Sequence, residues 1–318
     1  EQDYGKRHQM TSLRCHVRKY KDFLDYCERL IGKPIYDFDK DPDKPFINAA
    51  QFKKIVSLLR TKKNIILEGA PGVGKTFLAR KIAYQLIGEL KDENIEMVQF
   101  HQSYSYEDFV QGIRPSEEGG FERRNGIFFD FCSKARRSPD QQFVFIIDEI
   151  NRGNISKILG ELMMLIEADK RKKQYAIKLT YSNEDDERFF VPENVYLIGC
   201  MNTADRSLAI VDYALRRRFR FISIKPEFNE AFISFLKEKG ISQENAELVV
   251  SKVKAANEVI SCIDRGLEIG HSYFCQTDGC EDFSAWWNDI CEYELFPYLH
   301  EICFDDEDKY ELICNKLK

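Results

Sequence analysis

One short stretch of the chain has the residue types and spacing of a phosphate-binding loop. Residues 69–76 read GAPGVGKT and fit G-x-x-x-x-G-K-[ST], between an apolar run ending at Leu67 and a helical pattern starting near Lys75. Glycines let such a loop wrap around phosphates, and the positive end of the following helix attracts the anion. Lys75 would reach the terminal phosphates, and the Thr76 hydroxyl would hold Mg²⁺. The predicted nucleotide-binding residues are Gly69, Ala70, Pro71, Gly72, Val73, Gly74, Lys75, Thr76 and Phe77.

Two adjacent carboxylates follow the apolar run Phe143 to Ile147. In an open parallel sheet, ligands bind beyond the carboxyl ends of the strands, so Asp148 and Glu149 would face the phosphates. Asp148 suits the Mg²⁺ shell, and Glu149 suits a general base that deprotonates the attacking water. The alternative is a solvated strand end.

A polar residue and a basic cluster complete the candidate chemistry. Asn202 follows the next apolar run and would hydrogen-bond both the water and the terminal phosphate, or else cap a turn. Arg216, Arg217 and Arg218 end a helical pattern that starts near Leu208. Cations favour a helix C-terminus, so a structural role is one interpretation. Successive helical side chains point about 100° apart, so one or two of the three could instead reach a neighbouring subunit as arginine fingers.

The elements around these residues predict an α/β fold followed by helices. Buried parallel strands are expected at 65–67, 97–100, 143–147 and 195–198, with a fifth at 219–222. Helical stretches after the first, third and fourth runs indicate a doubly wound parallel sheet. After Pro226 only helical periodicity remains, at 231–239, 244–260 and 284–299. We therefore predict an N-terminal linker or remnant over 1–50, an α/β nucleotide-binding domain over 51–225 and a small helical lid over 226–318.

Bulk properties limit the other functions. The chain has 318 residues, a formal net charge of −6 and ten cysteines without a C-x-x-C pair, which favours buried thiols in a reducing cytoplasm. It has no apolar run of about 18 residues and no apolar core of a signal peptide, so we expect a cytoplasmic protein without membrane contact. The charge argues against nucleic-acid binding over the whole surface. The basic run 170–173 is expected to be a solvated loop or a loop facing a central pore.

Taken together, the motifs resemble the McrB family, the AAA+ P-loop GTPases of modified-cytosine-dependent restriction systems. The resemblance runs from about residue 50 to the end. Its stretches are NIILEGAPGVGKTF (64–77), MVQFHQSYSYEDFVQG (97–112), IIDEINRGNISKILG (146–160), MNTADRSLAIVDYALRRRF (201–219) and IGHSYF (269–274).

The resemblance implies a GTP-hydrolysing motor that prefers GTP over ATP and forms hexameric rings. It also implies a McrC-type nuclease partner and coupling of hydrolysis to DNA translocation. Asn202 and Asp205 match the family's signature loop, and Arg217 and Arg218 match its trans-acting arginines. Asn151 matches a position near the attacking water.

Two points depart from a simple transfer of function. Residues 1–50 are too short for the separate domain with which family members read the modified base, so this chain alone should not select methylated sites. It also lacks the N-K-x-D motif that reads guanine, so the base would be read elsewhere, around Ile35 and Tyr36 together with the lid. The alternatives are an ATP-driven protein remodeller and a nucleotide-gated assembly scaffold.

Overall fold

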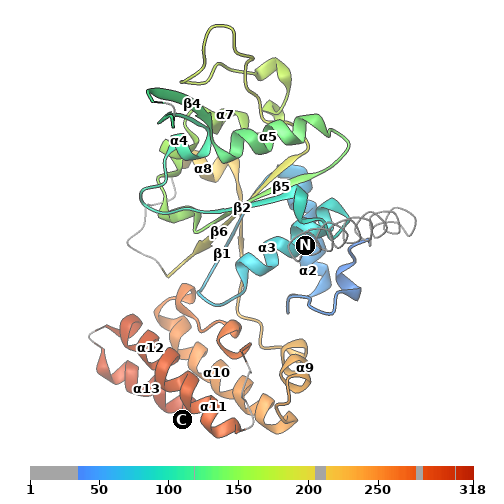
Figure 1. Ribbon diagram of the computed structural model, residues 1–318. Coiled ribbons are helices and arrows are strands. Elements are labelled where there is room, and N and C mark those ends of the chain that lie inside the picture. Colours follow the sequence, from blue (N-terminus) through green and yellow to red (C-terminus); the bar gives the residue numbers. More distant parts are fainter. Residues whose placement is uncertain (1–34, 118, 205–212, 277–281, 305) are drawn as a thin grey trace, which may run out of the picture.

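A parallel sheet and a helical bundle lie end to end in the computed structural model, which describes residues 35–117, 119–204, 213–276, 282–304 and 306–318 (Figure 1). Within these ranges the main sheet contains β1 (Asn64–Gly69), β2 (Ile95–Gln99), β5 (Phe143–Asp148), β6 (Val195–Asn202) and β7 (Arg220–Ser223). Each strand coincides with a predicted apolar run, and the prediction of a doubly wound parallel sheet is confirmed.

The strand order creates a crevice next to β1. The order is β2-β5-β6-β1-β7, and all neighbouring strands are parallel. The chain leaves β1 for the edge strand β2 and returns beside β1 only with β6, which produces a topological switch point between these two strands. Gly69 lies in register with Asn202. The predicted phosphate loop and the predicted polar strand end therefore meet at one edge of the sheet.

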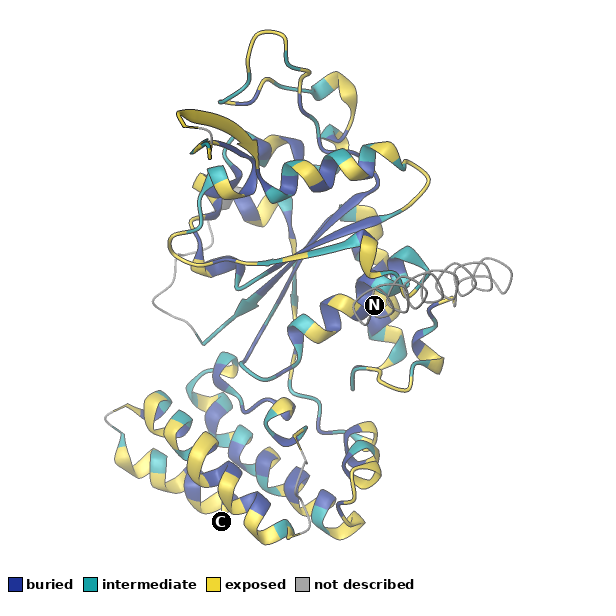
Figure 2. Cartoon of the chain, viewed as in Figure 1, coloured by how far each residue is buried: buried dark blue, intermediate teal, exposed yellow. Residues whose placement is uncertain are grey.

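Each face of the sheet has its own apolar core because side chains alternate along a strand. Ile65 and Leu67 pack with α2 (Ala49–Lys62) and α3 (Lys75–Ile87) on one face. Ile66 belongs to the core of the opposite face. The helices on that face are α4 (Tyr106–Phe109), α5 (Ile127–Arg137), α6 (Ile155–Leu159) and α7 (Leu162–Leu165). The central strands β1, β5 and β6 are accordingly mostly buried, whereas the edge strands β2 and β7 and the outer helix surfaces are partly exposed (Figure 2).

Two features of the α/β unit differ from the sequence prediction. The segment after β5 forms the short helices α6 and α7 where one helix was expected. An antiparallel hairpin of β3 (Gln111–Pro115) and β4 (Phe121–Asn125) was not predicted. Every residue of β4 is exposed and its sequence, FERRN, has no apolar alternation, so the usual pattern of a half-buried strand is missing.

The described residues between Glu230 and Leu317 form the helical unit. Its helices are α9 (Glu230–Glu238), α10 (Gln243–Ile263), α11 (Phe283–Ile290), α12 (Phe296–Cys303) and α13 (Glu307–Leu317), with one π-helical turn at Cys291–Leu295. The predicted helix at 284–299 is thus α11 and α12 joined by that turn. α8 (Tyr213–Arg218) connects β6 with β7 in the sheet unit. No helix in the described ranges has the length and apolar composition to cross a membrane.

Arg171 contradicts the expectation for the basic run at 170–173. Its side chain is only 1% exposed, so it is neither solvated nor pore-facing. Its Nε donates to the carbonyl of Ile166 at 3.1 Å, and its terminal nitrogens donate to the carbonyl of Val195 and to Asn64 Oδ1. Burial lowers the pKa of the guanidinium to about 10, so it remains charged at neutral pH. Arg171 thereby ties the end of α7 to the starts of β6 and β1.

We predict that Arg171→Met lowers the free energy of unfolding by about 3 kcal/mol, because the carbonyl of Val195 and Asn64 Oδ1 lose a buried donor and the carbonyl of Ile166 keeps only the bond from Asn64. Urea denaturation measures the change, with Lys173→Met as the matched control from the same run, since Lys173 is exposed. Equal unfolding midpoints for the two variants would contradict the bracing role.

Candidate functional site

The loop between β1 and α3 has the backbone shape required for anion binding. Gly72 and Gly74 have φ angles of 75° and 69°, in the left-handed region that favours glycine. Gly74 is the N-cap of α3, so the helix begins directly beneath the loop. The N–H groups of the first helical turn have no partner within the helix and are directed toward the loop. The predicted phosphate-binding geometry is present.

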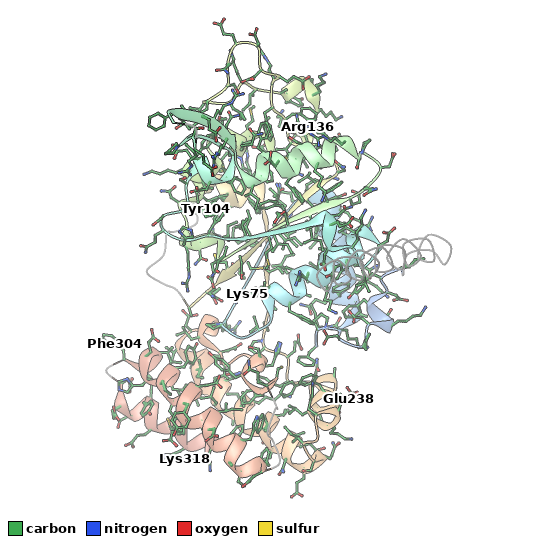
Figure 3. All side chains as sticks on the ribbon, in the orientation of Figure 1. Lys75, Tyr104, Arg136, Glu238, Phe304 and Lys318 are labelled. Carbon is green, nitrogen blue, oxygen red and sulfur yellow. The ribbon has the colours of Figure 1, made fainter. Side chains whose placement is uncertain are left out.

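Lys75 is held over this loop by neutral acceptors. Its side chain is 8% exposed and lies where the sheet unit meets the helical unit (Figure 3). Its Nζ donates to the carbonyls of Gly69 and Ala70 at 3.0 and 2.8 Å and to Asn202 Oδ1 at 2.5 Å. None of these three acceptors carries a charge. An incoming phosphate would therefore be a stronger partner for the ammonium group than any of them.

Thr76 and Asp148 form the hard-oxygen pair expected of a magnesium site. Thr76 Oγ1 donates to Asp148 Oδ1 at 3.1 Å, and Asp148 Oδ1 also accepts from the backbone N–H of Glu149 at 3.2 Å. A hydroxyl and a carboxylate suit Mg²⁺, which takes few protein ligands and completes its shell with phosphate oxygens and water. The described ranges contain no group of three or more His, Cys, Asp or Glu residues that could hold a metal ion.

Glu149 adopts a strained backbone that turns its side chain into the site. Its φ and ψ are 49° and 44°, an uncommon conformation for a residue other than glycine. Its Oε1 accepts from Asn202 Nδ2, and its Oε2 lies 3.3 Å from Arg152 Nε. Such strain persists where surrounding contacts fix it, frequently at functional sites.

Asn202 connects the cation and the carboxylate through one neutral amide. Its Oδ1 accepts from Lys75 and its Nδ2 donates to Glu149, so both ends of the amide are engaged. Asn151 lies beneath this bridge, 5% exposed, with its Nδ2 3.5 Å from the carbonyl of Asn202. Its Oδ1 is buried without a hydrogen-bond partner among the described residues. The structure thus brings Lys75, Thr76, Asp148, Glu149, Asn151 and Asn202 together.

The arginines lie at the opposite end of the strands, where the parallel strands of the sheet begin. Ile65 at the start of β1 pairs with Arg220, and Asn64 Nδ2 donates to the carbonyl of Arg218 at 3.0 Å. The phosphate loop follows the other end of β1, about 20 Å along the strand. Arg217 and Arg218 therefore cannot reach the nucleotide of their own chain. Asp205 falls outside the described residues.

Two cavities meet at the start of α3. The first, about 340 Å³, is lined by the loop and by Asp148, Glu149, Cys200 and Asn202. The second, about 520 Å³, is lined by 42–47 and by parts of the helical unit that include Glu227, Phe235 and His271. Gly74 and Phe77 line both cavities, so a nucleotide could extend from one into the other.

The second cavity is lined by only part of the region expected to read the base. The helical unit does line the second cavity, but Ile35 and Tyr36 do not. Tyr36 is buried and its hydroxyl donates to Asp41 at 2.8 Å, whereas Ile35 is exposed. The next segment, 42–47, contributes instead, because Tyr36 packs into the core beneath α2 and α3.

The helical unit contacts the phosphate loop through backbone atoms, which the sequence reasoning missed. Ser272 N–H donates to the carbonyl of Gly72 at 2.8 Å. A Cβ on Gly270 would lie 2.2 Å from the carbonyl carbon of Gly72, so only glycine permits this approach. His271 Nδ1 accepts from Glu227 N–H at 3.2 Å, and burial lowers its pKa to about 4. Neutral His271 thus carries its proton on Nε2, at the second cavity.

Comparisons with known proteins agree with this geometry. A model of the AAA domain (dynein-related subfamily) matches residues 64–219, and a model of the McrB α-helical lid domain matches residues 249–311. The type IV methyl-directed restriction enzyme EcoKMcrB subunit of Escherichia coli K12 is 51% identical over 279 residues, which cover 86% of this chain and 61% of that protein. The type II restriction enzyme BsuMI component YdiS of Bacillus subtilis 168 is 27% identical over 204 residues, 52% of this chain and 58% of that protein.

The chain therefore spans less than two thirds of the length of these two curated relatives. Among solved structures, C. elegans PCH-2 is similar with a TM-score of 0.41 and 14% identity, over 84% of this chain and 67% of that one. The fold, the phosphate loop and the family models define an AAA-type P-loop nucleoside triphosphatase. Within that class, the chain belongs to the McrB family.

We predict that Gly270→Ala weakens nucleotide binding about tenfold, about 1.4 kcal/mol, by displacing the lid from the phosphate loop. Titration with a fluorescent nucleotide analogue measures the affinity. Gly240→Ala is the control from the same helical unit, because nothing lies within 4 Å of an added Cβ there, although its φ of 96° strains the backbone; Gly270 has a φ of −76°, so only the close contact opposes a Cβ at that position. If both variants bind the analogue equally well, the backbone contact does not support the site.

Proposed function

We propose that this protein is a GTP-hydrolysing ring motor that serves a McrC-type nuclease and drives DNA translocation in modification-dependent restriction. Membership of the McrB family and 51% sequence identity to a restriction-enzyme subunit support the restriction role. The observation that carries the mechanism is the separation of two half-sites by β1. The phosphate loop lies at one end of that strand and the arginines at the other. A ring, hexameric by family resemblance, would bring the arginines of one subunit to the nucleotide of the next.

Within one subunit, the residues divide the work as follows. The loop N–H groups and Lys75 bind the phosphates, while Thr76 and Asp148 would hold Mg²⁺, which would supply positive charge to neutralise the phosphate oxygens. Glu149 accepts a proton from the attacking water, and Asn202 holds the carboxylate at a fixed orientation. Asn151 offers its unpaired Oδ1 to the same water. The arginines of the neighbouring subunit stabilise the charge that develops during phosphoryl transfer.

A partly buried carboxylate in the lining of the second cavity, that of Glu227, supports guanine as the base. Guanine presents an N1–H and an N2–H₂ donor on one edge, and a carboxylate accepts two such donors side by side. Adenine lacks this donor pair. Glu227 lines the cavity, and burial raises the pKa of its carboxyl group, so it is partly removed from water. A polar group in this position discriminates between bases more strongly than an exposed one.

Phosphate release measured with GTP and ATP in parallel tests the nucleotide choice. We expect faster turnover of GTP, and Glu227→Ala should reduce the ratio of GTP to ATP turnover about tenfold, the loss of one charged hydrogen bond. Glu238→Ala is the control, since Glu238 lines the same cavity but is exposed. Faster turnover of ATP would place the protein with ATP-driven remodellers.

Glu149→Gln tests the catalytic role of the carboxylate. The glutamine keeps an acceptor for Asn202 but cannot take a proton, so turnover should fall about a hundredfold or more while nucleotide binding persists. Single-turnover hydrolysis and equilibrium binding separate the two effects. Unchanged hydrolysis would exclude Glu149 as the base, and a wild-type chain without turnover would favour the assembly scaffold.

A further inference from the structure

The three consecutive arginines at the end of α8 have different surroundings. The Arg216 guanidinium lies 5.6 Å from the ring centre of Phe221 and faces β7. The Arg218 side chain is 15% exposed, and its Nε donates to the carbonyl of Met163 at 2.5 Å. The Arg217 side chain is 74% exposed. Arg217 is therefore far more exposed than Arg218, and Arg216, which is also exposed, packs against Phe221.

One carboxylate binds both of the last two arginines. Glu167 Oε1 lies 2.9 Å from Arg217 Nη2 and 3.0 Å from Arg218 Nη2. The Glu167 side chain is only 18% exposed, and its backbone is fixed just after α7 by the bond from its N–H to the carbonyl of Met164. Charge-assisted bonds of this kind are short and directional. Glu167 therefore determines the position of the exposed Arg217 guanidinium.

The residue before Glu167 belongs to a buried network of hydrogen bonds. The carbonyl of Ile166, the preceding residue, accepts from Asn64 Nδ2 at 2.8 Å and from Arg171 Nε at 3.1 Å. The same Asn64 nitrogen donates to the carbonyl of Arg218 at 3.0 Å. Asn64 begins β1, the strand that ends at the phosphate loop. The carboxylate and the arginine corner are thus fixed to one strand by shared hydrogen bonds.

We propose that Glu167 is a positioning residue for the arginine that acts on the neighbouring subunit. Glu167 orients Arg217 toward the nucleotide bound by the neighbouring subunit. The largely buried Arg218 holds the Glu167 carboxylate in place. This inference rests on the proposed catalysis between subunits. Because Glu167 lies at the amino-terminal edge of the sheet, it has no contact with the nucleotide site of its own chain. Its effect must therefore appear in the neighbour's turnover.

Glu167→Gln keeps the side-chain size and removes the charge. We expect kcat for GTP to fall about tenfold or more, with KM and nucleotide affinity unchanged, because a displaced arginine affects the transition state and leaves ground-state binding intact. Glu193→Gln is the matched control, since Glu193 is exposed and pairs only with Lys172, at 3.9 Å, among the ion pairs of the described residues. Glu167→Asp, which restores the charge on a shorter side chain, should recover part of the loss.

A mixture of subunits identifies the chain in which Glu167 acts. Glu149→Gln subunits lack the base but retain both arginines, so they should supply Arg217 to the intact bases of Glu167→Gln subunits. We expect the mixture to be more active than either variant alone, as a mixture of Arg217→Ala and Glu149→Gln subunits should be.

The remaining outcomes overturn the inference in distinguishable ways. If the Arg217→Ala mixture recovers activity and the Glu167→Gln mixture does not, Glu167 acts within its own chain, and the inference fails while catalysis between subunits stands. If neither mixture recovers, catalysis between subunits fails as well. Unchanged kcat in a folded Glu167→Gln variant, checked by thermal unfolding, also overturns it. If Glu167→Gln does not fold, Glu167→Asp takes its place in the same mixture.

Discussion

One strand determines how this protein can work. β1 ends in the phosphate loop, and its first residue, Asn64, hydrogen-bonds the corner that carries the arginines. The strand is rigid and central, with β6 on one side and β7 on the other. The two groups of side chains to which we assign catalysis are thereby held apart within one chain. A second copy, placed with its amino-terminal sheet edge against the nucleotide site of the first, would bring them together.

At the nucleotide edge, one neutral amide separates opposite charges. Lys75 and Glu149 line the same small cavity and carry opposite charges. Without Asn202 between them, the ammonium and the carboxylate would attract each other directly. The amide accepts from one and donates to the other, and so keeps both side chains oriented. The lid adds a second constraint, because the Ser272 N–H bond to Gly72 fixes it to the loop that binds phosphate. The lid and the phosphate loop are therefore joined through the backbone.

The sequence predicted the nucleotide edge well because its patterns are local. A glycine loop between a strand and a helix, and acids after an apolar run, have their structural context within a few residues. The role of Arg171 depends on acceptors from Asn64 and Val195, which are distant in sequence, so a basic run suggested a solvated loop. Gly270 likewise matters only because Gly72 lies against it. The β3–β4 hairpin escaped prediction because its exposed residues carry no apolar pattern.

The dependence of turnover on protein concentration tests the central claim most directly. If each nucleotide site is completed by a neighbouring chain, GTP turnover per subunit should rise with concentration and level off as the assembly forms, in parallel with the mass measured by light scattering. Constant turnover per subunit down to concentrations at which only monomers are present would contradict the account, because a single chain holds its arginines at the wrong end of β1.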